Sequence, residues 1–182
     1  MAHVVVLGAG VAGHTAALHL KRLVGKQHTI TVVSPNSQWN WIPSNIWVGV
    51  GEMPAEKVLF PLAPVYKRKG IEFTQAKAVA LHPEGDAAGP QGFVDIEHTS
   101  PDHKGETGTV HYDYLINATG PKLRFEATPG LGPDGHTLSV CTADHATHAA
   151  AALASAIEKM KAGQHQTFVI GTLMYSAKAP VR

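Results

Sequence analysis

The sequence predicts an α/β fold in which a parallel sheet with crossover helices carries a small antiparallel β-meander insertion. Three observations predict it. An apolar run at residues 3–7 breaks into spaced glycines and then into a helix-compatible stretch. A second apolar run follows at residues 28–33, so strand, helix and strand form a βαβ unit. Further along, three short extended runs are separated by polar turns, which is typical of a meander.

The first strand ends in Gly8, Gly10 and Gly13, which have the spacing Gly-x-Gly-x-x-Gly. Gly8 permits a tight turn, Gly10 leaves room for phosphate oxygens near the backbone, and Gly13 lets the helix pack closely on the strand. Free N–H groups at the helix start then face the anion. The pattern predicts a Rossmann-like dinucleotide site. The alternative is an ordinary glycine turn, which the flanking strands and helix disfavour.

The next elements are punctuated by glycine and proline. Apolar residues at helical spacing continue the first helix until Gly25 ends it. Residues 34–51 form a loop-rich segment with all three tryptophans, which either plug the sheet edge or wall a planar ligand. Prolines at 61 and 64, cations at 67–69 and Gly70 predict a second helix with a charged end.

Strands dominate the middle of the chain. Residues 71–74 are expected to continue the sheet. Extended runs near 78–82, 92–98 and 109–112 form the antiparallel insertion, which we place at about residues 77–112. The polar turns between them have the character of exposed loop tips and are assigned no chemistry.

An apolar strand that starts at Tyr112 stops abruptly at Thr119 and Gly120. Ligands of doubly wound sheets lie outside the carboxyl ends of the strands, so this end is a candidate ligand contact; an ordinary strand-to-loop turn is the alternative. An alanine-rich helix is expected at residues 142–162, capped by Thr142 or Asp144. A further strand is expected at residues 167–171.

Composition excludes several classes of protein. Lys+Arg number 15 against Asp+Glu 14, and this balance argues against nucleic acid as a partner. No apolar run approaches the roughly 20 residues of a membrane-spanning helix, and no signal-peptide pattern precedes the first strand. We therefore expect a cytoplasmic protein or one peripheral to a bacterial-type inner membrane. The single cysteine, Cys141, excludes an intramolecular disulfide and a multi-cysteine metal site.

Four segments together carry a narrower signal: the glycine motif, Ile-Pro-Ser-Asn-Ile-Trp-Val-Gly-Val-Gly at 42–51, residues 112–122, and Cys-Thr-Ala-Asp-His-Ala at 141–146. In this combination the chain resembles the sulfide:quinone oxidoreductases over nearly all its length. These are flavoproteins with two dinucleotide-binding domains, alongside flavocytochrome c sulfide dehydrogenases and type II NADH dehydrogenases. The resemblance implies bound FAD, oxidation of sulfide, and electron delivery to quinone at the membrane surface.

The resemblance also implies which residues hold FAD. At the end of the second strand, Ser34 replaces the acidic residue that most flavoproteins have there, and a hydroxyl bonds the ribose without bringing charge. The implied contacts are Gly8, Ala9, Gly10 and Gly13 with the pyrophosphate, Ser34 and Asn36 with the adenosine ribose, Pro43, Ser44 and Asn45 with the flavin, Ala78 with adenine through its backbone, and Thr119 and Gly120 closing over the cofactor.

Cys141 is the candidate for the sulfur chemistry that the resemblance implies. A thiolate is the nucleophile toward sulfur species and flavin, and a helix start or nearby positive charge favours the ionised form. Cys141 directly precedes the helix expected at 142–162, and His145 lies one turn further on. The alternative is a small buried apolar residue without redox function.

The last residues predict a domain boundary. We expect an FAD-binding domain at residues 1–162 and, at 163–182, the truncated start of a second dinucleotide-binding domain, because the eleven residues after the strand expected at 167–171 cannot complete another βαβ unit. The resemblance implies a further cysteine after that strand, but residues 172–182 contain none. We therefore expect either divergence from sulfide chemistry or an incomplete portion with weak or no activity, whose membrane contact lies in a missing C-terminal region.

Two other functions stay open. An NADH:quinone reductase of the same fold needs no redox cysteine, and a non-catalytic dinucleotide-binding domain needs no electron donor. His145 and His148 share one helix face, but no third ligand lies at useful spacing. We expect no metal site there and favour a solvated helix face.

Overall fold

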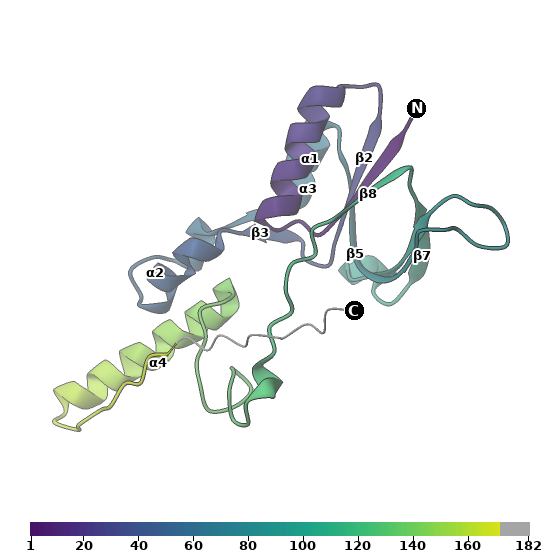
Figure 1. The fold of residues 1–182 in the computed structure, drawn as a ribbon. Coiled ribbons are helices and arrows are strands. Elements are labelled where there is room, and N and C mark those ends of the chain that lie inside the picture. The colour runs from purple at the N-terminus through teal and green to yellow at the C-terminus, as the bar shows by residue number, and fades with distance from the viewer. Residues whose placement is uncertain (172–182) are drawn as a thin grey trace.

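A computed structural model describes residues 1–171 of the chain (Figure 1). It confirms the predicted α/β class with a Rossmann-like parallel sheet and an antiparallel extension. The six strands of the main sheet are, in spatial order, β7 (Thr107–His111), β6 (Phe93–His98), β5 (Glu72–His82), β2 (Thr29–Ser34), β1 (His3–Leu7) and β8 (Tyr114–Asn117).

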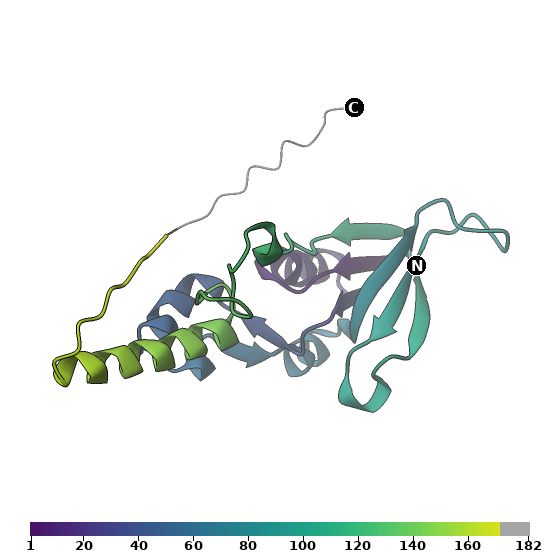
Figure 2. The ribbon, with the colours of Figure 1, turned by 90° about the horizontal axis from the view of Figure 1, so that it is seen from below.

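The remaining elements form a helical layer and a separate block. Two helices pack side by side on one face of the sheet, and a long and a short helix lie next to each other away from it (Figures 1 and 2). The layer is α1 (Val11–Val24) and α3 (Leu62–Lys69); the block is α2 (Asn45–Gly49) and α4 (Ala143–Lys161), and the hairpin of β3 (Gln38–Asn40) and β4 (Leu59–Pro61) flanks α2 in sequence.

Parallel pairing defines the centre of the sheet. β1 pairs in parallel with β2 and β8, and β2 pairs in parallel with the start of β5. The valine-rich β1 is buried on both faces, as parallel central strands require. Val4 and Val6 face a core with α1 and α3, whereas Val5 and Leu7 face a second core with the meander.

β5 corrects one prediction, because the two runs expected at 71–74 and 78–82 are a single strand. Residues Glu72 to Gln75 pair in parallel with β2. From Ala76 onward the same strand pairs antiparallel with β6, with a register shift between Ala78 and Ala80. The long strand thereby joins the dinucleotide-type sheet to the insertion without a break.

The segment 34–51 is more ordered than predicted, since it contains β3, a short 3-10 helix at Ile42–Ser44 and α2. A third apolar cluster, formed by Val48, Val58, Ala143 and Ala146, joins α2 to α4. The three tryptophans differ in their surroundings. Trp39 stacks on Phe60 and packs against the sheet core, whereas Trp41 and Trp47 are exposed.

Helix ends follow the predictions closely. Gly25 follows α1, and Gly70 ends α3 in the left-handed conformation, with φ of 65°. The Thr142 side chain accepts a hydrogen bond from the His145 amide and so caps α4.

The strand expected at 167–171 is wrong: no strand forms there, because within the described part of the chain no neighbouring strand is available to pair with it. Residues 172–182 lie outside the described residues.

Candidate functional site

The glycine turn between β1 and α1 is set by two very close backbone approaches. A Cβ atom on Gly8, where φ is +92°, would overlap the carbonyl oxygen of Ala118. A Cβ on Gly13 would overlap the carbonyl oxygen of Gly8. In contrast, a Cβ on Gly10 would have no heavy atom within 4 Å among the described residues. Gly8 and Gly13 therefore permit packing, while Gly10 faces open space.

Free amides gather at the start of α1. The first helical hydrogen bond runs from the His14 amide to the Gly10 carbonyl, at 2.9 Å, so the N–H groups of Val11, Ala12 and Gly13 precede the hydrogen-bonded turns. The first turn carries no acidic side chain. The Gly8 amide is different, because it donates to the Val33 carbonyl at 2.8 Å. An anion at this turn would thus be bound from the helix side of Gly8.

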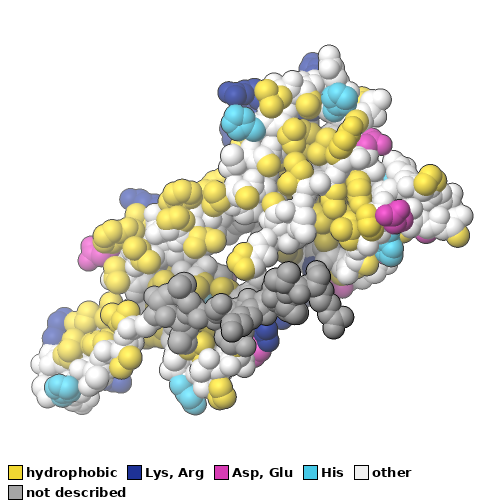
Figure 3. Space-filling model, in the orientation of Figure 1, with side chains coloured by type: hydrophobic (Ala, Val, Ile, Leu, Met, Phe, Trp, Pro, Cys, Tyr) yellow, Lys and Arg dark blue, Asp and Glu magenta, His cyan; other side chains and the backbone are white. Residues whose placement is uncertain are grey.

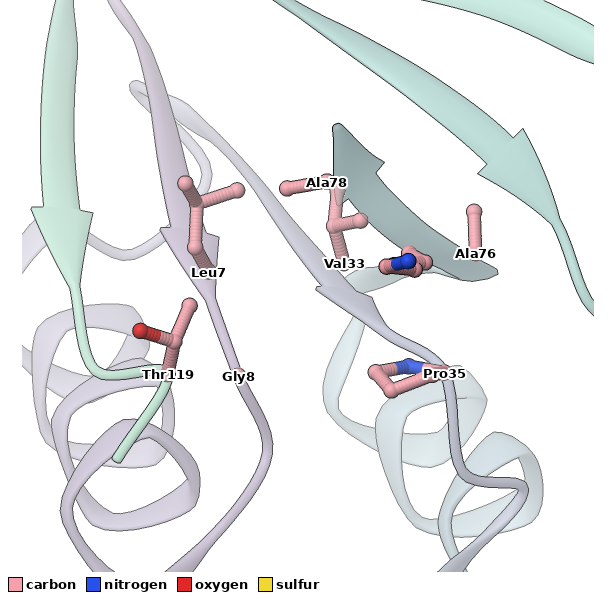
Figure 4. Close-up of a pocket in the computed structure, with 8 residues that line it drawn as sticks. Leu7, Gly8, Val33, Pro35, Ala76, Ala78 and Thr119 are labelled. Carbon is pink, nitrogen blue, oxygen red and sulfur yellow. The ribbon is translucent and has the colours of Figure 1, made fainter. Parts of the chain in front are cut away.

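A cavity of about 200 Å³ opens beside this turn, at the carboxyl ends of β1, β2 and β8 (Figure 4). It is smaller than the roughly 300–1,000 Å³ of sites that enclose a whole drug-sized ligand, so it suits one part of a dinucleotide. In Figure 4 Gly8 and Thr119 lie on adjacent strand ends, across the cavity from Ala76 and Ala78 of β5. The lining residues are Leu7, Gly8, Val33, Pro35, Ala76, Lys77, Ala78 and Thr119.

Three predicted contacts, Gly8, Ala78 and Thr119, therefore meet in one cavity. Ser34 lies between the lining residues Val33 and Pro35; it is buried, and its Oγ accepts a hydrogen bond from the Asn36 amide at 3.4 Å.

On the opposite strand end, Thr119 donates its hydroxyl to Asn117 Oδ1 at 2.9 Å. Gly120 has φ of +73°, a backbone conformation that glycine adopts without strain, and a Cβ there would meet no described atom within 4 Å. This end of β8 is therefore open on the side of Gly120.

The residues predicted at the flavin have mixed exposure. Pro43 is exposed and Ser44 half-buried, in the 3-10 helix that precedes α2. Asn45 is completely buried, and its amide group exchanges two hydrogen bonds with that of Asn40, at 2.9 and 3.0 Å. Asn40 also donates to the Val58 carbonyl at 3.3 Å. The Asn45 side chain thus fixes the start of α2 and does not line open space.

Cys141 is exposed and directly precedes the N-cap of α4, as predicted. Its amide donates to Ser139 Oγ at 3.1 Å. The nearby His145 has a buried Nδ1 atom with no hydrogen-bond partner among residues 1–171. Cys141 does not line the cavity, so the structure does not bring the cysteine and the glycine turn together.

Sequence reasoning missed two features of this region. Lys77 lines the cavity. Its place there depends on β5 continuing beyond the end of β2, and the sequence around Lys77 has no motif that would predict this. His14 and Tyr66 form a buried pair, with His14 Nδ1 lying 3.0 Å from the tyrosine hydroxyl. Burial lowers the pKa of His14 and raises the pKa of Tyr66 to about 12, so both are neutral near pH 7. The sequence feature that could have predicted this pair is a histidine that directly follows Gly13 in a helix rich in apolar residues.

Two kinds of feature are absent from residues 1–171. Within this range, no helix has the length and apolar character needed to cross a bilayer. In the same part of the chain, no group of three or more His, Cys, Asp or Glu side chains has an arrangement that suits a metal ion.

Known proteins match this arrangement. The family described as pyridine nucleotide-disulphide oxidoreductase matches residues 2–172. The sulfide-quinone reductase of Aquifex aeolicus is 34% identical over 144 residues, covering 79% of this chain and 29% of the relative. The external alternative NAD(P)H-ubiquinone oxidoreductase B3 of Arabidopsis thaliana is 28% identical over 138 residues, covering 74% of this chain and 22% of the relative.

A solved structure of a relative has the same fold over most of this chain. The X-ray structure of the Aquifex aeolicus sulfide:quinone oxidoreductase superposes with a TM-score of 0.71 at 30% identity, covering 87% of this chain and 33% of that one. The chain therefore spans about a third or less of the length of these relatives. The resemblance to sulfide:quinone oxidoreductases is confirmed. The glycine turn, the free amides and the match over residues 2–172 lead to one conclusion: the chain belongs to the pyridine nucleotide-disulphide oxidoreductase family, whose members are FAD-binding flavoproteins.

Proposed function

We propose that this chain is the FAD-binding part of a flavoprotein that oxidises sulfide and passes the electrons to quinone. The observation that carries the FAD site is the open space at Gly10 beside free helix amides and the 200 Å³ cavity. A diphosphate needs this combination of backbone access and unpaired N–H groups. The same proposal divides the chain into an FAD-binding unit at 1–162 and a second unit that begins at 163.

Each end of the cofactor has a place in this proposal. The amides after Gly8 would hold the diphosphate, and the cavity between Gly8 and Ala78 would hold the adenosine. Pro43 and Ser44 would lie toward the flavin, and the buried Asn45–Asn40 pair would keep their segment in position. Bound FAD supplies two-electron redox chemistry, while these residues supply orientation and the electrostatic environment.

Sulfide is the proposed donor and quinone the proposed acceptor. The similarity to the Aquifex sulfide-quinone reductase supports both. The exposed Cys141 before α4 supports the donor, because a cysteine sulfur that solvent can reach can be joined oxidatively to the sulfur of a small donor. In this role the sulfur of Cys141 and that of sulfide would be joined in a persulfide, and the two electrons that this bond formation releases would pass to bound FAD and then to quinone.

NAD(P)H is the second candidate donor. The similarity to the Arabidopsis NAD(P)H-ubiquinone oxidoreductase favours it, and so does the single cysteine, because hydride transfer needs no redox cysteine. A stopped-flow experiment separates the two. The purified chain is loaded with FAD and mixed anaerobically with sulfide or with NADH. Flavin bleaching by sulfide that is lost in Cys141→Ser supports the sulfide proposal; bleaching by NADH alone would overturn it.

FAD binding is tested with Gly10→Val. The Gly10 backbone, at φ −69° and ψ −170°, accepts any residue, so valine would fill only the space meant for phosphate. We expect wild type to quench FAD fluorescence and gain thermal stability on titration, and Gly10→Val to do neither. Gly89→Val is the matched control, since Gly89 also has open space around its Cβ but lies in the loop between β5 and β6 and not at a helix start. Equal FAD retention in wild type and Gly10→Val would show that this turn does not bind the diphosphate.

A further inference from the structure

The loop that follows β2 is tied to the antiparallel insertion by a side chain. Pro35, the first residue of this loop, lines the cavity, and in the view of Figure 4 its ring projects from the end of β2 toward Gly8. The hydroxyl of Thr99 donates a hydrogen bond to the Pro35 carbonyl at 2.8 Å, although 64 positions separate the two residues in sequence. Thr99 directly follows β6, so this contact joins the insertion to the edge of the cavity.

Thr99 is itself held in place by β5. Its amide donates to the Gln75 carbonyl at 3.0 Å, and the Gln75 side chain donates to the Thr99 carbonyl at 3.4 Å. Gln75 is in turn the parallel partner of Ser34, the last residue of β2. The Thr99 hydroxyl therefore has a position that is fixed by the backbone of the folded sheet.

The beginning of the loop has little else to hold it. Pro35 and Asn36 are exposed, and a proline has no backbone N–H group to donate. Within the described part of the chain, one further hydrogen bond from a distant segment reaches residues 35–37: the Leu62 amide donates to the Ser37 carbonyl at 2.9 Å. That contact lies at the far end of the loop. The end beside the cavity thus depends on Thr99.

The position of Pro35 matters because Ser34 and Asn36, the predicted ribose contacts, are its two neighbours in sequence. A loop that is already held in its bound position need not be ordered when the ligand binds, and this lowers the cost of binding. We propose that Thr99 is a positioning residue for the cofactor, which holds Pro35 so that Ser34 and Asn36 meet the adenosine end of FAD. The inference rests on the proposed function, and it adds a role for the antiparallel insertion in binding the cofactor.

Thr99→Val tests this role, because it removes the hydroxyl but keeps the branched shape and the amide that donates to Gln75. The purified chain is titrated with FAD and with ADP, which carries the adenosine and the diphosphate without the flavin. Isothermal titration is expected to give a Kd about threefold to tenfold higher for both ligands in the variant, as the loss of one hydrogen bond predicts. An equal rise for the two ligands would assign the effect to the adenosine end.

Two further variants separate this role from a general loss of stability. Thr99→Ser keeps the hydroxyl and is expected to bind both ligands like wild type. Thr109→Val is the matched control, because it removes a hydroxyl that donates to Asp95 Oδ1 at 3.0 Å within the same insertion. It is expected to leave both Kd values unchanged.

Hydrogen–deuterium exchange supplies a readout that does not depend on the Kd values. Coupling between two sites is reciprocal, so a ligand that orders the loop also strengthens its contact with the insertion. Saturating ADP is expected to slow exchange in residues 98–106 of wild type, to have a smaller effect there in Thr99→Val, and to leave residues 107–111 unchanged in both.

The outcomes separate this inference from the proposed function. Kd values in Thr99→Val equal to those of wild type, a Thr99→Ser variant that binds as weakly as Thr99→Val, or exchange at 98–106 that ADP does not slow would overturn the inference and leave the FAD site in place. A wild-type chain that binds neither FAD nor ADP would overturn the proposed FAD site, and the inference with it.

Discussion

Gly10 and Gly13 are separated by only two residues, yet their surroundings predict opposite effects of the same substitution. A Cβ at position 13 would overlap the Gly8 carbonyl oxygen, which the turn cannot move. We expect Gly13→Ala to lower the free energy of unfolding by about 1–3 kcal/mol, as overpacking does. Urea denaturation measures this loss.

Gly10→Ala is the comparison for that measurement. Its Cβ would enter open space, and the loss of a favourable N-cap residue is offset by the smaller entropy of the unfolded chain. We expect a change within about 1 kcal/mol. Equal destabilisation by the two alanines would show that the close approach at Gly13 does not exist in solution.

The buried pair of His14 and Tyr66 makes stability depend on pH. Burial lowers the pKa of His14, so between its ordinary value of 6.5 and its folded value the unfolded state binds the proton and the folded state does not. Stability is therefore lost as the pH falls below about 6.5, by at most about 1.4 kcal/mol per pH unit. His14→Gln should show a shallower fall. Melting temperatures from pH 8 to pH 5 test this, and identical profiles would contradict it.

At the scale of elements, the cap of α4 offers a direct test. Thr142 accepts the His145 amide, so Thr142→Ala should cost about 1 kcal/mol of unfolding free energy. Thr147→Ala is the matched control, since that hydroxyl donates to the Ala143 carbonyl inside the helix, where alanine is the better helix former. Denaturant titration should show a loss for the first variant and none for the second.

Elements with local signals were predictable from the sequence, and those set by distant contacts were not. The valines of β1, the glycine after α3 and the cap of α4 lie in the segments that they define. The five-residue α2 has no such signal, because it depends on packing Val48 against residues of α4 nearly a hundred positions later. The strand expected at 167–171 failed for the converse reason: its apolar residues lack a described partner strand.

The residues of the candidate site also fall into those that the sequence predicts locally and those that depend on distant contacts. The spacing of Gly8, Gly10 and Gly13 is a property of the sequence, and this spacing is enough to predict the turn. Lys77 and the Tyr66 partner of His14 depend on how β5 and α3 pack against the first βαβ unit. Sequence reasoning therefore predicted a turn whose geometry is local and missed two side chains whose positions depend on distant elements.

At the scale of the whole molecule, the apolar core is divided unevenly. Two clusters cover the two faces of the sheet, while a third, small cluster joins α2 to the first half of α4. The buried residues of α4 are Ala143, Ala146 and Ala149, all in its first two turns. In the second half Ile157 and Met160 are exposed, and Figure 3 shows apolar side chains on this part of the surface.

This division predicts that the molecule opens locally before it unfolds. Amides with few buried contacts behind them exchange through low-energy openings, whereas those of a doubly covered sheet exchange only through larger ones. We expect hydrogen–deuterium exchange, read by mass spectrometry, to be at least about tenfold faster in the last two turns of α4 than in β1 and β2. The first turn of α4, packed on α2, should fall between them. Uniform protection along α4 at the level of the sheet would show instead that the helix and sheet unfold as one cooperative unit.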